Sequence, residues 1–179
     1  FFPQIASDRV SINLKMPEGT SVNITDSIIS MIEKKVWIIN EEFTAKQSDN
    51  RQVVENVIKR LGPGTATGSL DINLLPGELR EVQSSVISEA IRKAAGPIYG
   101  AESIVFGSGG NFGGSPVSVS LLGSNISELK AAKDELKTAL QNNGLLKDIT
   151  DNDPEGIKEI KINLKEKAYL LGLSTQEVM

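Results

Sequence analysis

Short segments in which apolar and polar residues alternate recur along the chain. They lie at residues 9–16, 69–74, 117–121 and 159–164. Because alternate side chains of a strand point to opposite faces of a sheet, this period of two predicts strands that are buried on one face. Each segment precedes a stretch with helical spacing of apolar residues, so the sequence predicts a repeated strand–helix design.

The helical stretches have recognisable ends. Ser21 or Thr25 can cap the first helix, Gly96-Pro97 stops the second, and Ser127 is the predicted cap of the third. Trp37 belongs to the apolar stripe of the first helix and is predicted to be a core residue. The predicted stripes comprise Ile28, Ile29, Ile32, Val36 and Ile39 in the first helix, and Val82, Val86, Ile87, Ala90 and Ile91 in the second.

Two further strands, at 53–60 and 101–106, complete a βαββαβ order over roughly the first 110 residues. This order predicts an α+β, ferredoxin-like unit in which both helices cover one face of an open sheet. A second unit of the same kind begins near Ser115, with strands at 117–121 and 146–149, but stops short. We therefore predict tandem ferredoxin-like units, the second incomplete, followed either by an inserted module after about residue 155 or by the end of the chain within a domain.

Composition removes several classes of function. The chain has a net charge of −4, with 4% aromatic residues and no clustered basic surface, which argues against nucleic-acid binding. With no histidine and no cysteine, histidine-based triads, thiol catalysis, Cys/His zinc sites and disulfides are excluded. No apolar run approaches the roughly 20 residues of a membrane helix. We predict no cofactor, no metal site and no enzymatic activity.

A glycine-rich stretch at 107–114 is the most conspicuous motif. A nucleotide-binding loop needs glycine at the first, third and sixth places, whereas the sixth here is Phe112, and a strand rather than a helix follows Pro116. The stretch is therefore predicted to be an interdomain linker. Its glycines are Gly107, Gly109, Gly110, Gly113 and Gly114.

The loop at 62–68 admits two readings. It is either a simple flexible hairpin connection or a mobile loop bordering a binding cleft. Acidic residues such as Glu41, Glu42, Glu78 and Glu81 lie at helix ends or on polar faces, where solvated charge is the expected role.

Several segments, taken in order, resemble the periplasmic porter region of resistance-nodulation-division efflux pumps of the acriflavine-resistance type. The resemblance covers essentially the whole chain. The segments are Phe1-Phe-Pro-Gln4, Leu14-Lys-Met-Pro-Glu-Gly-Thr20, Ser69-Leu-Asp-Ile-Asn-Leu-Leu-Pro76, Val105-Phe-Gly-Ser-Gly109, Glu159-Ile-Lys-Ile-Asn-Leu164 and Leu170-Leu-Gly-Leu-Ser174.

The resemblance implies an excised piece of a longer membrane protein. Residues 1–112 would be the first C-terminal porter subdomain, 113–154 the first half of the second, and 155–179 the start of the docking insertion. Such pumps are proton-driven homotrimers on the periplasmic side of the inner membrane of Gram-negative bacteria. They work with a periplasmic adaptor and an outer-membrane channel, and export small molecules; the substrate type here is unknown.

The resemblance also implies a substrate path bordered by the 62–68 loop. The matching positions are Ile58, Arg60, Gly62, Gly64, Ser69 and Asp71. Arg60 and Asp71 are predicted to pair across adjacent strands. Multidrug members have a Phe-rich loop here, whereas the loop of this chain has no aromatic residue. The resemblance therefore implies either a more polar or lipid-like substrate or another purpose for the cleft.

Two other classes remain open from the residues themselves. One is a stand-alone ferredoxin-like binding or regulatory module that dimerises through its sheet edges. The other is an enzyme of the same fold that uses only carboxylates and lysine.

Overall fold

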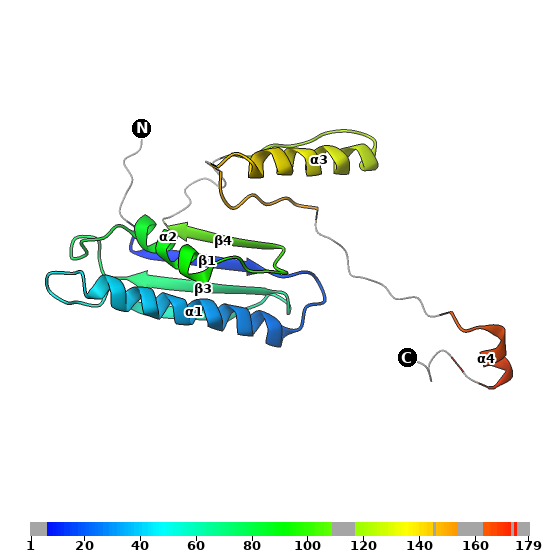
Figure 1. The fold of residues 1–179 in the computed structure, drawn as a ribbon, viewed down its shortest axis with the longest axis horizontal. Helices are drawn as coiled ribbons and strands as arrows, with labels where there is room; N and C mark the ends of the chain where they lie inside the picture. Colours follow the sequence, from blue (N-terminus) through cyan, green and yellow to red (C-terminus); the bar gives the residue numbers. More distant parts are fainter. Residues whose placement is uncertain (1–6, 109–116, 145, 154–162, 173, 175–179) are drawn as a thin grey trace.

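The computed structural model describes residues 7–108, 117–144, 146–153, 163–172 and 174 (Figure 1). Its first six elements follow the predicted βαββαβ order. The elements are β1 (Arg9–Lys15), α1 (Val22–Thr44), β2 (Val54–Leu61), β3 (Thr67–Leu74), α2 (Ser84–Ala95), β4 (Ser103–Ser108), α3 (Ile126–Gln141) and α4 (Glu166–Leu170).

The four strands form one antiparallel sheet in the order β2-β3-β1-β4. β1 lies in the middle, paired with β3 from Arg9↔Asn73 to Lys15↔Thr67 and with β4 on its other side. A strand that returns to pair beside the first one is the arrangement of the ferredoxin-like split βαβ unit. The predicted α+β, ferredoxin-like fold is therefore confirmed for residues 9–108.

A single core joins the sheet to both helices. Alternate strand residues such as Ile12 and Ile72 are fully buried, and they belong to one cluster with Ile32 of α1 and Ile87 of α2. Since the inward residues of the strands share one face of the sheet, α1 and α2 both cover that face, as Figure 1 shows. The predicted one-sided layering is confirmed.

The cap of α1 and the stop of α2 lie where predicted, but Val82, assigned to the second helical stripe, precedes α2. Ser21 caps α1 by accepting a hydrogen bond from the Asn23 N–H at 3.3 Å, and Gly96 ends α2 with φ 67°. Trp37 is 37% exposed and Val86 is 48% exposed, so both core assignments were wrong. At about 100° per residue, each lies beside the buried stripe rather than in it.

The segments predicted as strands, 117–121 and 146–149, are irregular in the structure, so this prediction was wrong. Val117 and Val119 are exposed, with no strand beside them in the described part of the chain. The strand predicted at 159–164 falls largely on residues 154–162, which lie outside the described residues.

The cap of α3 also differs from the prediction, because Asn125 rather than Ser127 occupies it. Its side-chain oxygen accepts from the N–H groups of Ser127 at 3.0 Å and Glu128 at 3.4 Å. Its amide in turn donates to the Glu128 carboxylate at 2.8 Å. With the cap two residues earlier, Glu128 stands at the third helical position, from which its carboxylate reaches the Asn125 side chain.

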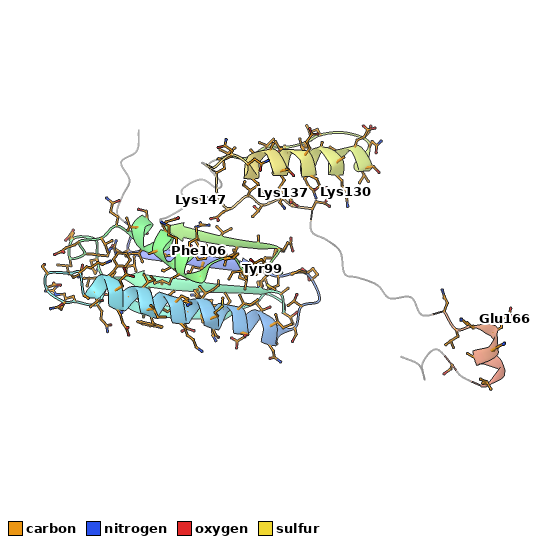
Figure 2. The ribbon with its side chains drawn as sticks, in the orientation of Figure 1. Tyr99, Phe106, Lys130, Lys137, Lys147 and Glu166 are labelled. Carbon is orange, nitrogen blue, oxygen red and sulfur yellow. The ribbon has the colours of Figure 1, made fainter. Side chains whose placement is uncertain are left out.

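Ion pairs hold α3 to the segment 146–153. Lys137, labelled on α3 in Figure 2, contacts Asp151 at 2.6 Å. Lys133 contacts Asp153 at 2.9 Å. The hydrogen bond from Lys137 lowers the pKa of Asp151, and the hydrogen bond from Lys133 lowers the pKa of Asp153. No residue of α3 is buried, so these charges are a principal attachment of the helix within the described residues.

We therefore expect this attachment to depend on pH. Because the folded-state pKa values are lowered, the stabilisation is present above the ordinary aspartate range and is lost as pH falls through those lowered values. Lys137→Gln should raise the titration midpoint of Asp151, measured by NMR from the carboxyl carbon. Lys34→Gln, at an exposed position of α1, is the matched control. A midpoint that Lys137→Gln leaves unchanged would contradict the assignment.

Candidate functional site

Four of the six predicted site residues lie together on two neighbouring strands. Ile58 and Arg60 belong to β2, whereas Ser69 and Asp71 belong to β3. In the register of the two strands, Ile58 lies opposite Asp71 and Arg60 lies opposite Ser69. We refer to these four residues as the β2–β3 patch.

The β2–β3 patch lies on the face of the sheet opposite α1 and α2, which the described helices leave uncovered. Ser69 and Asp71 alternate with Leu70 and Ile72, which point into the core. Lys59, between the two β2 members of the patch, instead reaches Asp26 of α1 at 2.7 Å. We call the uncovered side the open face.

Asp71 is the electrostatic centre of the patch. Its Oδ2 accepts from Nη1 of Arg60, which confirms the predicted cross-strand pair. Its Oδ1 lies 3.0 Å from Nη2 of Arg9, a residue of β1. The carboxylate is 14% exposed, while the guanidinium-bearing side chains of Arg9 and Arg60 are 56% and 54% exposed.

Sequence reasoning missed Arg9. The available signal was the strand order, since a ferredoxin-like sheet places β1 beside β3 and so brings the first outward residue of β1 close to Asp71. Because both arginines are more than half exposed, each pair contributes little to folding, on the order of 0–1 kcal/mol. Arg9, Arg60 and Asp71 therefore matter less for stability than for the charge that they place on the open face.

Apart from Val105 of β4, the rest of the open face carries polar or small residues. The Asn73 side-chain amide donates to Asn56 Oδ1 at 2.8 Å. Gly107 lies in β4, so its assignment to a linker was wrong, and a Cβ there would lie 2.9 Å from Ser11 Oγ. The other predicted linker glycines, at positions 109, 110, 113 and 114, lie outside the described residues.

The loop between β2 and β3 is shorter and more firmly held than predicted. Gly62 and Gly64 have φ values of 104° and 77°, which glycine adopts at little cost. The Thr25 hydroxyl donates to the Thr65 carbonyl at 2.7 Å, and the Met16 N–H donates to Ala66 O at 2.7 Å. The second half of the loop is thereby tied to the N-terminal end of α1 and to the end of β1.

Gly68, predicted as part of the loop, is a buried residue of β3 that permits close packing. A Cβ there would lie 2.7 Å from Cγ1 of Ile29. We expect Gly68→Ala to lower the free energy of unfolding by about 1–3 kcal/mol through overpacking. At Gly64 a Cβ meets open space, so Gly64→Ala should cost only the positive φ, about 1–2 kcal/mol.

A double-mutant cycle separates the two causes in chemical denaturation. Combined with Ile29→Ala, which removes the clashing atoms, Gly68→Ala should cost at least about 0.5 kcal/mol less than it does alone. Gly64→Ala should be additive with Ile29→Ala. Additivity at Gly68 as well would show that the close approach to Ile29 is misplaced.

A second cluster, which the sequence did not predict, joins α2 and β4 to the segment 146–153. Arg92 Nη2 contacts Asp148 Oδ2 at 2.7 Å, and this carboxylate also accepts from the Phe106 N–H at 3.3 Å. The hydrogen bond to Asp148 raises the pKa of Arg92, whose guanidinium lies 4.7 Å from the centre of the Phe106 ring. Asp148 thereby joins the segment 146–153 to α2 and to the edge strand β4, a structural role.

Other chemistry is sparse in the described residues. No group of three or more acidic side chains there converges on a point where a metal could bind. A shallow hollow lies along α2, beside Val86 and Lys93, away from the open face. None of the described helices combines the length and apolar character needed to span a bilayer.

Comparisons with protein families, with curated proteins and with solved structures gave no match to this chain. The β2–β3 patch is therefore interpreted from its own geometry and from the resemblance described above.

Proposed function

We propose that this chain is part of the periplasmic substrate path of a proton-driven efflux transporter of the resistance-nodulation-division type. One observation carries the proposal. The four strand residues that the resemblance assigns to the substrate path form a single patch on the sheet face opposite α1 and α2, which no helix among the described residues covers. They would act by contact and positioning, without catalysis.

The β2–β3 patch and the loop beside it offer both apolar and charged contacts to a small molecule. Ile58 is 40% exposed and offers an apolar contact, while Arg60 offers a charged one. Gly62 and Gly64 lie in the loop that directly follows β2, with backbone conformations that favour glycine. Loops on rigid sheets are common sites of binding, because the sheet fixes where they begin and end.

The chemistry of the open face favours polar or amphiphilic substrates over flat aromatic ones. Its strand positions carry Ser11, Asn13, Ser69 and Asn73, and none of its outward positions is aromatic. Aromatic side chains supply most of the stacking area for flat drugs. In the proposed assembly, a homotrimer with a periplasmic adaptor and an outer-membrane channel, the membrane part would supply the proton-driven work.

Transport by the full-length protein tests the proposal. With expression and trimer assembly verified, Arg60→Ala and Asp71→Ala should each lower the export of at least some compounds in a panel. Because a contact with an exposed charged group contributes at most about 1 kcal/mol, the expected loss is up to about fivefold. Arg51→Ala is the control, since Arg51 is equally exposed and pairs with Asp49 off the sheet. Export of every compound at the parental rate by both variants would refute the proposal.

A further inference from the structure

Two arginines of the open face share one carboxylate, in a chain that is acidic as a whole. The net charge of the chain is −4. The outward strand positions carry Arg9, Lys15, Arg60 and Asp71, and Glu55 lies at the bulge of β2, so the excess of positive charge is confined to the two arginines around Asp71. Lys15 is neutralised by Glu102 at 2.6 Å. Two guanidinium groups are left to share a single carboxylate.

Asp71 cannot saturate both arginines. Each of its two oxygens already contacts one guanidinium, and the carboxylate itself is largely covered. A guanidinium has five N–H donors, so a contact with one carboxylate oxygen leaves others for a further acceptor. Both arginines are more than half exposed, which keeps those donors accessible.

An apolar side chain adjoins this charge. Ile58 lies directly opposite Asp71 and two residues before Arg60, on the same face, and it is 40% exposed. The open face thus places two guanidinium groups, those of Arg9 and Arg60, near the exposed hydrocarbon of Ile58. That combination matches a molecule with an anionic group attached to an apolar body.

We propose that the open face selects anionic amphiphiles, with Arg9 and Arg60 binding a carboxylate or sulfate group and Ile58 contacting the adjoining hydrocarbon. This inference rests on the proposed function, since it names the substrate class of the same path. Because the arginines are solvent-exposed, binding is moderate in strength and weakens as ionic strength rises. Arg9 thereby becomes a specificity-determining residue together with Arg60.

Binding of three probes with the same alkyl chain tests the selection. The ¹⁵N-labelled chain is titrated with decanoate, decyltrimethylammonium and decyl maltoside, each below its micelle concentration. Decanoate should shift amide signals of β2 and β3 with a Kd at least fivefold lower than that of either other probe. The Arg9→Gln/Arg60→Gln double variant should reduce decanoate binding to the level of the neutral probe. Arg51→Gln, at an exposed arginine off the sheet, should leave it unchanged.

Equal affinity for the three probes, preference for the cation, or shifts confined to other elements would each overturn the inference. Export of the same compounds by the full-length protein keeps the two proposals apart. If it exports the cationic probe as well as decanoate, the path stands and the anion selection fails. If it exports no compound of any charge, the proposed function fails, and the titration alone decides whether the face selects anions.

Discussion

Ile32→Ala is expected to lower the free energy of unfolding by roughly 2–5 kcal/mol, the range for truncation of a core aliphatic side chain. Ile32 is fully buried on the inner face of α1. It shares one core cluster with Ile72 of β3 and Ile87 of α2. The truncation removes apolar contacts and leaves a cavity between the helix layer and the sheet, which close-packed neighbours fill only in part.

Ile38→Ala is the matched control, because it makes the same chemical change on the same helix at a side chain that is 54% exposed. Its effect should stay within about 0.5 kcal/mol. Urea denaturation followed by circular dichroism measures both. Equal effects of the two substitutions would mean that the face of α1 assigned to the core is wrong.

Arg80→Met is expected to lower the free energy of unfolding by roughly 2–4 kcal/mol. The Arg80 side chain is 1% exposed, and it donates to three backbone carbonyls. The acceptors are Leu75 O at 2.6 Å, Val82 O at 2.7 Å and Ser7 O at 3.0 Å. Methionine fills much of the same volume, but it leaves these carbonyls without their donor, at about 1–3 kcal/mol for each one that stays buried.

Arg51→Met controls for the loss of an arginine, since Arg51 is 54% exposed and makes a surface pair with Asp49 at 3.0 Å. It should change stability by at most about 1 kcal/mol. Burial lowers the pKa of Arg80, yet an arginine stays protonated in proteins, so its contribution should not vary near neutral pH. If Arg80→Met costs no more than Arg51→Met, the carbonyl bonds do not stabilise the fold.

The sequence predicted the first sheet because β1 and β3 alternate and each has a neighbouring strand to pair with. Val117 and Val119 follow the same alternation, yet they are 63% and 57% exposed in an irregular segment. Alternation shows which face of a strand would be buried, but pairing requires a second strand beside it. Within the described residues no such strand lies next to 117–121.

The part of the candidate site that lies on the β2–β3 hairpin could be predicted from the sequence. Arg60 and Asp71 lie on consecutive strands joined by a short loop, so their pairing follows from the hairpin. Arg9 depends on the order of strands far apart in sequence. Arg80 could not be predicted at all, since its partners are backbone carbonyls with no side-chain signal. Trp37 was wrongly predicted to be buried, because in the sequence an apolar residue beside the buried stripe of a helix looks like part of that stripe.

The transporter assignment is tested most directly by the sequence of the gene on both sides of the segment that encodes residues 1–179. We predict that the same reading frame continues in both directions into several apolar stretches of about 20 residues, each long enough to cross a bilayer. A reading frame that stops soon after the codon for Met179 and contains no such stretch would contradict it. That result would favour a stand-alone ferredoxin-like binding module.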